Sequence, residues 1–229
     1  MDAALNLIES GIFGVSEAAT LVGATERKVR GWVTGYKTSG IGPLIDNEIG
    51  WLDGRLAFSF TNLMEIRFVA FFVKAGVKLR YIRAIMQEVK RELDHPHPFA
   101  TRVVFRTDGR KIVAEIARRN GITDLYDLRS KNFEMRSVVL ASLREDVEYD
   151  PKGVIRLWRP RPRVAPHVIV HPKFAFGRPI LQASRIPTST LRRAVAAEGS
   201  AAAVADFYDL PVKQVQEAVM FERELRMAA

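Results

Sequence analysis

The chain has 229 residues, no cysteine, and 35 Lys and Arg against 26 Asp and Glu, which gives a formal net charge of +9. The lack of cysteine excludes a disulfide scaffold, a thiolate zinc site and a cysteine nucleophile. No apolar run approaches the ~18 residues that a membrane helix needs, and the acidic start lacks the pattern of a secretion signal. We therefore expect a soluble, cytoplasmic protein whose positive charge favours a nucleic acid or another acidic partner.

The chain divides into three segments that differ in charge and in hydrophobic period. Residues 1–94 have a net charge of +1 and read as helical, residues 95–163 have +6 and read as β-rich, and residues 164–229 have +2 and read as helical again. We predict an α+β, mainly helical fold with an N-terminal winged helix-turn-helix domain, a middle or linker region that contains β-hairpins, and a C-terminal domain of three helices. Most of the positive charge therefore lies in the middle segment.

The first segment contains the signals of a helix-turn-helix motif. Ser16 is expected to cap one short helix, Gly23 to form the turn, and Thr25 to cap a second helix that ends at Gly35. Two short helices with matched apolar faces across a glycine turn are typical of this motif. The glycine-rich stretch 35–54 suits a small β-wing.

Further elements follow from the periodicity. Apolar residues spaced by three and four predict helices over Thr61–Lys74 and Leu79–Leu93. Hairpins are predicted over Val103–Glu115, around an Asp-Gly turn, and over Asp146–Trp158, with a helix over Phe133–Leu143 between them.

The last segment is predicted to contain a short strand, His167–Val170, followed by three helices. Thr188 is expected to cap the first helix, Ser200 to cap the second, and Pro211 to lie in the first turn of the third.

The second helix of the predicted motif carries the main candidates for DNA contact. In a helix-turn-helix the N-terminal half of this helix meets base edges and phosphates in the major groove. With Val29 and Trp32 turned inward, the basic side chains of this half face outward, where arginine can pair with guanine and any cation can neutralise phosphate. The alternative is a solvated helix with no ligand. The candidate DNA-binding residues are Ser16, Thr25, Arg27, Lys28, Arg30 and Lys37.

At these residues the sequence resembles the winged helix of MerR-type regulators over about the first 90 residues. The long coiled coil of that family does not follow, so an effector-sensing activator is not expected. The matching motifs are Val15-Ser-Glu-Ala-Ala-x-Leu-x-Gly23, Thr25-x-Arg-x-Val-Arg30, Phe60-Thr-Asn-Leu63 and Gly76-Val-x-Leu79.

The C-terminal segment resembles the antitoxin-associated domain of unknown function 433, a three-helix winged-helix-like fold. The matching motifs are His171-Pro-x-Phe174, Phe176-Gly-Arg-Pro-Ile180, Arg185-Ile-Pro187 and Val204-Ala-Asp-x-Tyr208. A MerR-like head joined to this tail is similar to VapB-type antitoxins, which are encoded beside PIN-domain (VapC-like) ribonucleases. The resemblance implies a homodimer that represses its own promoter and neutralises such a ribonuclease.

Two further sets of polar residues are open to more than one interpretation. The middle segment ends in a basic ribbon of alternating arginines, which suits a DNA backbone, the acidic metal pocket of a PIN nuclease, or a plain solvated linker. The last helix has a broad apolar stripe that favours protein contact over DNA, although its first turns offer polar side chains. The ribbon comprises Arg156, Arg159, Arg161 and Arg163, and the second candidate DNA contact comprises Lys213, Gln214 and Gln216.

The sequence contains no motif of a catalytic site. We expect no enzyme, metal or cofactor. The pair His95/His97 lies in a proline break, and the pair His167/His171 spans a predicted strand, where a spacing of four does not align the rings. No phosphate-binding glycine loop occurs. The acidic cluster at residues 145–150 is interpreted as a solvated turn near arginines. Two alternatives to an antitoxin remain, a stand-alone MerR-like transcription regulator and a scaffold whose helical modules serve only packing.

Overall fold

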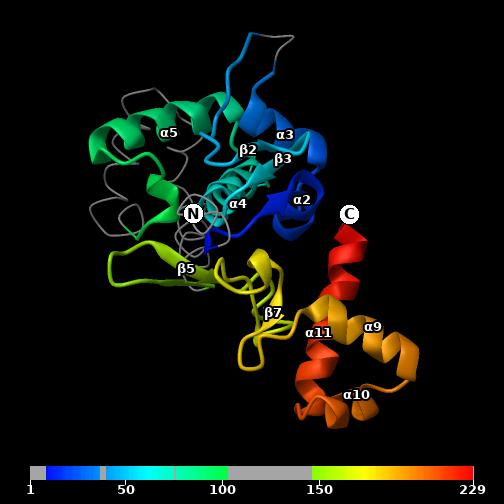
Figure 1. Cartoon of the computed structure of the whole chain (residues 1–229). Coiled ribbons are helices and arrows are strands. Elements are labelled where there is room, and N and C mark those ends of the chain that lie inside the picture. The colour runs from blue at the N-terminus through cyan, green and yellow to red at the C-terminus, as the bar shows by residue number, and fades with distance from the viewer. Residues whose placement is uncertain (1–8, 37–39, 75, 103–145, 229) are drawn as a thin grey trace, which may run out of the picture. The chain divides into compact units, whose positions relative to one another are not determined.

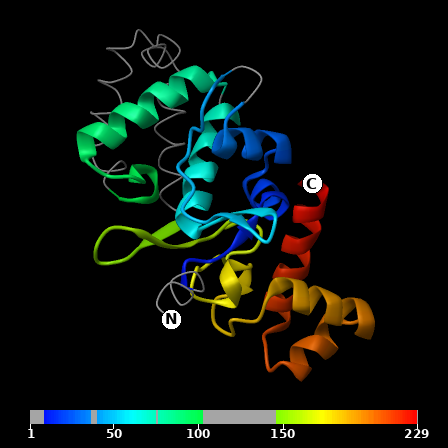
Figure 2. The ribbon, with the colours of Figure 1, turned by 45° about the horizontal axis from the view of Figure 1, so that its top comes forward.

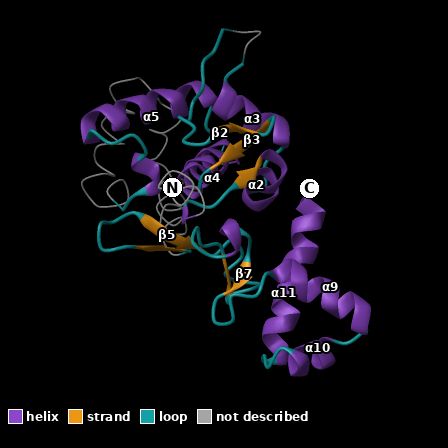
Figure 3. Ribbon diagram, viewed as in Figure 1, coloured by secondary structure: helices purple, strands orange, loops and turns teal. Residues whose placement is uncertain are grey.

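The computed structural model describes residues 9–36, 40–74, 76–102 and 146–228 (Figure 1). These residues form seven α-helices and three small sheets of two or three strands, so the predicted α+β class is confirmed (Figure 3). No helix among them has the length and hydropathy that crossing a membrane requires.

The chain forms two compact units, each built from segments that are distant in sequence. The first contains Met1–Thr25, Ile49–Phe60 and Leu157–Ala229, and the second contains Glu26–Glu48 and Thr61–Arg156. The three consecutive domains expected from the sequence, residues 1–94, 95–163 and 164–229, stay a prediction.

A three-stranded antiparallel sheet opens the first unit. Its strands are β1 (Phe13–Gly14), β2 (Gly50–Leu52) and β3 (Arg55–Phe58), in the order β1-β3-β2. Strands β2 and β3 are joined by Asp53 and Gly54, both with positive φ (47° and 73°), as a tight two-residue hairpin turn requires. This hairpin lies at the end of the stretch in which a β-wing was predicted.

Helix α2 (Val15–Val22) follows β1 directly and corrects one predicted cap. Its N-cap is Gly14, which has no side chain to offer, so Ser16 lies inside the first turn and does not cap the helix. At the other end Gly23 adopts φ 68° and ψ 42° and donates its N–H to helix carbonyls. The predicted glycine turn is therefore confirmed, because the left-handed conformation costs glycine little.

The rest of the first unit contains β6 (Val168–Ile169) and β7 (Ile180–Leu181), which pair antiparallel, and three helices. In the views of Figures 1 and 2, α9 (Thr188–Glu198) and α10 (Ala201–Phe207) both lie beside the long α11 (Val212–Ala228), and both contact it. Their common core is apolar and fully buried. It includes Leu191, Val204, Val215, Ala218 and Phe221.

The predicted caps of these helices are correct in one case and wrong in another. Ser200 caps α10, because its Oγ accepts a hydrogen bond from the Ala203 N–H at 3.3 Å. Thr188 does not cap α9, whose N-cap is Pro187. The Thr188 hydroxyl instead donates to the Glu222 carboxylate at 2.5 Å, and so connects the start of α9 to α11.

The second unit is built mainly on three helices, α3 (Glu26–Thr34), α4 (Phe60–Lys74) and α5 (Leu79–Leu93). The first residue of α4 precedes the unit's second segment, which begins at Thr61. The bounds of α5 are those predicted. Ile82, Ile85, Met86 and Val89 form its buried stripe, as the three-and-four spacing requires.

The second predicted hairpin is confirmed as β4 (Val147–Tyr149) and β5 (Ile155–Trp158), which form a two-stranded sheet. The turn between them is closed by the Asp150 N–H, which donates to the Val154 carbonyl at 2.8 Å. Gly153 supplies the positive φ of 84° that this turn needs. The predicted hairpin over 103–115 and the helix over 133–143 lie outside the described residues.

Candidate nucleic-acid and protein-contact surfaces

Helix α3 separates an apolar face from a basic one. Val29 and Trp32 are 0% and 2% exposed, and Val33 is also buried. The basic residues of the first half of the helix, Arg27, Lys28 and Arg30, are all exposed. The predicted orientation of the helix is therefore confirmed. Three of the four consecutive residues 27–30 carry a positive charge and face the solvent.

The C-terminal end of α3 is fixed by the loop that follows it. The Trp32 carbonyl accepts hydrogen bonds from the Leu44 and Ile45 N–H groups at 2.7 and 3.1 Å. Gly35 has φ 77°, and a Cβ on it would lie 2.5 Å from the Ile41 carbonyl oxygen. Only glycine fits this close approach of two backbone segments, so the loop fixes where α3 ends.

The other predicted DNA-binding residues are placed as follows. Ser16 is exposed in the first turn of α2, and Thr25 is exposed just before α3 begins. Lys37 lies outside the described residues. Ser16 and Thr25 belong to the first unit, whereas Arg27 belongs to the second. The exposure of Ser16 and Thr25 is therefore described separately from that of the basic residues of α3.

The basic ribbon differs from the predicted extended chain. After β5 the backbone turns, and the Val164 and Ala165 N–H groups both donate to the Arg161 carbonyl. The guanidinium of Arg161 donates to the Leu21 carbonyl at the end of α2 at 3.4 Å and lies 3.7 Å from Glu224 of α11. Arg161 therefore connects elements of the first unit.

The remaining arginines of the ribbon also have distinct surroundings. Arg156 pairs with Glu148 across the hairpin at 2.7 Å, and Arg159 donates to the Gln182 side chain at 3.0 Å. Arg163 is exposed in the turn. Instead of one continuous row of guanidinium groups, the ribbon offers Arg156 and Arg163 as its exposed members.

The second candidate DNA contact lies at the start of α11. Lys213 and Gln216 are exposed there, and Gln214 is half-buried. On the buried side of the same helix, Glu217 accepts a hydrogen bond from the His167 backbone N–H and lies 2.9 Å from His167 Nδ1. His167, in the turn immediately before β6, therefore connects the start of that strand to α11.

A buried polar network around α4 was not predicted. Glu65 is fully buried, and its Oε2 lies 2.9 Å from His97 Nδ1. His97 Nε2 lies 3.4 Å from Glu48, so the imidazole bridges two carboxylates. Burial lowers the pKa of His97, but the hydrogen bond and charge of Glu65, with the charge of Glu48, outweigh it and raise the pKa.

The amide of Asn62 extends this network to the loop before β2. Its Nδ2 donates to the Asp46 carbonyl at 2.7 Å, and its Oδ1 accepts from the Glu48 N–H at 2.9 Å. Lys90 of α5 pairs with Asp46 at 2.8 Å. The sequence signal for the network was the occurrence of Asn62 and Glu65 inside a mostly apolar helix.

Asp146, the first described residue of the acidic cluster, is largely buried, which corrects its interpretation as part of a solvated turn. Asp146 pairs with Arg67 of α4 at 2.5 Å, and the two side chains are only 17% and 9% exposed. Burial lowers the pKa of Arg67, and the charge and hydrogen bond of Asp146 oppose this shift. Glu148 pairs with Arg156, as expected of a residue near arginines.

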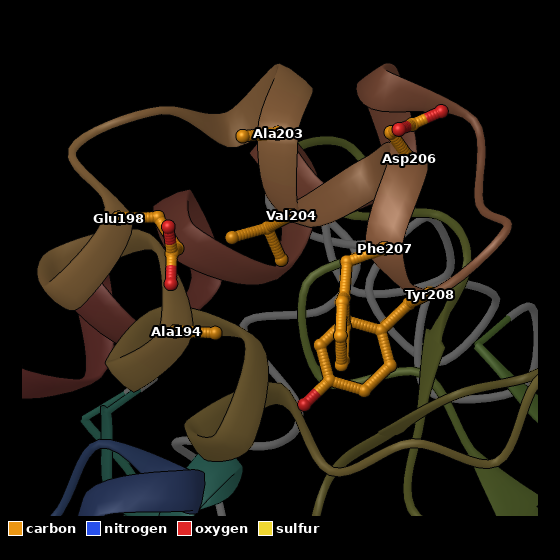
Figure 4. Close-up of a pocket in the computed structure, with 7 residues that line it drawn as sticks. All are labelled: Ala194, Glu198, Ala203, Val204, Asp206, Phe207 and Tyr208. Carbon is orange, nitrogen blue, oxygen red and sulfur yellow. The ribbon is translucent and has the colours of Figure 1, made fainter.

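Described residues of the first unit line two of the hollows in the structure. One, of about 490 Å³, lies where α2 faces the start of α9 and the end of α11, and is lined in part by Glu17, Arg178 and Arg226. Burial raises the pKa of Glu17 against the opposing charge of Arg178. The other, of about 400 Å³, lies between α9 and α10 (Figure 4). The described residues thus include a basic surface on α3 and, in the first unit, one hollow beside α2 and one between α9 and α10.

Comparison with known proteins identifies a similar fold and no family. No protein-family model matches the chain, and no curated protein matches it. The X-ray crystal structure of Rv2018 from Mycobacterium tuberculosis is similar, with a TM-score of 0.72 over 90% of this chain and 96% of that chain, at 17% sequence identity. At this identity the similarity shows a shared fold alone.

Proposed function

We propose that the protein is a DNA-binding antitoxin that represses its own promoter and neutralises a PIN-type ribonuclease. The observation that carries the DNA-binding half is the surface of α3, where three exposed cations stand opposite the buried Val29 and Trp32. The resemblance of the N-terminal segment to MerR-type winged helices and of the C-terminal segment to antitoxin-associated domains supports the combination of the two activities.

DNA recognition would proceed through the first half of α3. Its N–H groups and cations favour phosphate at the helix N-terminus, while arginine reads guanine edges in the major groove. The exposed Thr25, which precedes the helix in sequence, would contact a phosphate at the helix N-terminus. Two copies of the chain would read two half-sites, which doubles the phosphate contacts without a larger domain.

Neutralisation of the ribonuclease would fall to the C-terminal helices and the exposed arginines of the ribbon. A PIN-type active site holds Mg²⁺ between carboxylates, and a guanidinium fork matches a carboxylate with two parallel hydrogen bonds. Arg163 is exposed, and Arg156 is 53% exposed although it pairs with Glu148. As exposed members of the ribbon, either of these side chains is a candidate to enter such a pocket.

Co-expression with the product of the adjacent gene tests the antitoxin half. A stable complex that abolishes ribonuclease activity supports it. If no complex forms and the neighbour is not a ribonuclease, the antitoxin half fails, and a stand-alone MerR-like regulator becomes the better account. A gel shift on upstream DNA, with and without the neighbour, then shows whether DNA binding depends on a partner.

The DNA-binding half is tested by the α3 triple variant, in which Arg27, Lys28 and Arg30 are changed to alanine. These side chains are exposed, so their replacement leaves the buried face of α3 intact and lowers the positive charge of its surface by three. Weaker binding with a lower salt dependence supports the proposal. Unchanged affinity would mean that another surface holds the DNA.

A further inference from the structure

The hollow between α9 and α10 combines aromatic and acidic side chains. It measures about 400 Å³ and is lined by seven residues, of which two are aromatic, two acidic and none basic. Figure 4 shows Glu198 of α9 on one side, the Phe207 and Tyr208 rings on the other, and the small side chains of Ala194 and Val204 between them.

Phe207 is unusually exposed for a residue of its type. It is the last residue of α10 and is 80% exposed, whereas its helix neighbours Val204 and Ala205 are buried in the core of the three-helix module. Its ring meets that of Tyr208 edge-on, with 5.0 Å between the centroids and an interplanar angle of 81°. This geometry leaves an aromatic face of Phe207 available to a ligand.

The acidic groups of the hollow are also exposed. Glu198 and Asp206 are both solvent-facing, and they lie on a protein whose net charge is +9. A local negative charge on a basic protein attracts a cation, not DNA or another polyanion. An aromatic face beside a carboxylate binds ammonium and guanidinium groups by cation–π attraction together with charge pairing.

We propose that this hollow receives an arginine or lysine side chain of a partner protein, with its alkyl stem on Val204 and Ala194 and its charged head between Phe207 and Glu198. The inference rests on the proposed function and deepens it, because a ribonuclease must present cations to its RNA substrate. If an arginine or lysine of the ribonuclease entered the hollow beside α10, the antitoxin would cover part of the surface with which the ribonuclease binds its RNA substrate.

The site is tested on the full chain with two peptides that differ in one side chain, acetyl-Gly-Arg-Gly-amide and acetyl-Gly-Leu-Gly-amide. Amide chemical shifts of Ala194, Ala203 and Tyr208 are followed by NMR during each titration. The arginine peptide should shift these signals saturably, and the leucine peptide should not. Phe207→Ala should weaken the binding about two- to fivefold, as expected for loss of a cation–π contact at an exposed ring, and Glu198→Gln combined with Asp206→Asn should weaken it further in low salt.

Met227→Ala is the matched control, because Met227 is 79% exposed and Phe207 80%, in the same three-helix module. It should leave the peptide affinity unchanged. Equal shifts with both peptides would overturn the inference, because they would show an apolar groove. So would unchanged affinity in Phe207→Ala, or a wild-type dimer in sedimentation that this variant dissociates, because a second copy would then occupy the site.

A second measurement separates this inference from the proposed function. Calorimetry with the adjacent-gene ribonuclease compares the wild type, Phe207→Ala and Met227→Ala. If the arginine peptide binds but no ribonuclease complex forms, the antitoxin function fails and the cation site stands. If the ribonuclease binds all three proteins equally and the peptide does not bind, the cation site fails and the function stands.

Discussion

The buried ion pair between Arg67 and Asp146 offers a quantitative test of how the second unit is held together. It joins the middle of α4 to the residue before β4, which are 79 positions apart in sequence. With side chains 9% and 17% exposed, neither charge is well hydrated. Removal of one partner from a buried ion pair typically costs about 3–5 kcal/mol.

Asp146→Ala should therefore lower the free energy of unfolding by about 3–5 kcal/mol. For a chain of this length each kcal/mol lowers Tm by about 2–4 °C, so the melting temperature should fall by about 6–20 °C. Urea denaturation followed by far-UV circular dichroism gives the first value, and calorimetry gives the second.

The double variant Arg67→Met, Asp146→Ala is the necessary companion. It removes both charges and keeps an unbranched apolar side chain, so it should be more stable than Asp146→Ala alone, with a coupling energy above about 1 kcal/mol. Two results would contradict this reasoning. The effects of Arg67→Met and Asp146→Ala on the free energy of unfolding could simply add in the double variant, or Asp146→Ala could cost less than about 1 kcal/mol, as for an exposed pair. Either result would show that this ion pair does not stabilise the second unit.

Two further predictions concern the loop after α3 and the imidazole of the buried network. Gly35→Ala should destabilise the chain by more than Gly54→Ala, because both positions have positive φ but only the first places a Cβ against backbone, 2.5 Å from the Ile41 oxygen; equal losses of Tm would contradict this. Since the pKa of His97 is raised in the folded state, its contribution is complete below the unfolded pKa of about 6.5 and is lost as pH rises through the folded value. His97→Gln should therefore cost more stability at pH 6 than at pH 9 in urea titrations, and a larger cost at pH 9 would refute the role of Glu65.

Periodicity and glycine turns made much of the local structure predictable from the sequence. The bounds of α5, the left-handed Gly23 and the hairpin around Gly153 follow from local spacing and backbone freedom. Helix caps were less certain. Ser16 was expected to cap α2, but β1 pairs with β3 up to Gly14, so the helix begins at once with the buried Val15.

The tertiary polar contacts could not be predicted, because their partners are far apart in the chain. Glu65 and His97 are 32 positions apart, and Arg161 lies 140 positions from the Leu21 carbonyl that it contacts. Sequence alone showed Arg161 as one of four equivalent arginines. The fold distinguishes them, because it turns the backbone at Arg161 and uses its guanidinium between α2 and α11.

The most direct test of DNA binding by α3 is the salt dependence of affinity for the upstream DNA. Fluorescence anisotropy between 50 and 200 mM salt should show wild-type binding, and the α3 triple variant should have a slope smaller by up to about 3, since each phosphate contact contributes about 0.9. A control with Lys152→Ala and Arg193→Ala, both exposed and outside α3, should keep the wild-type slope. No wild-type binding at 50 mM salt, or the same slope in the triple variant, would contradict the account.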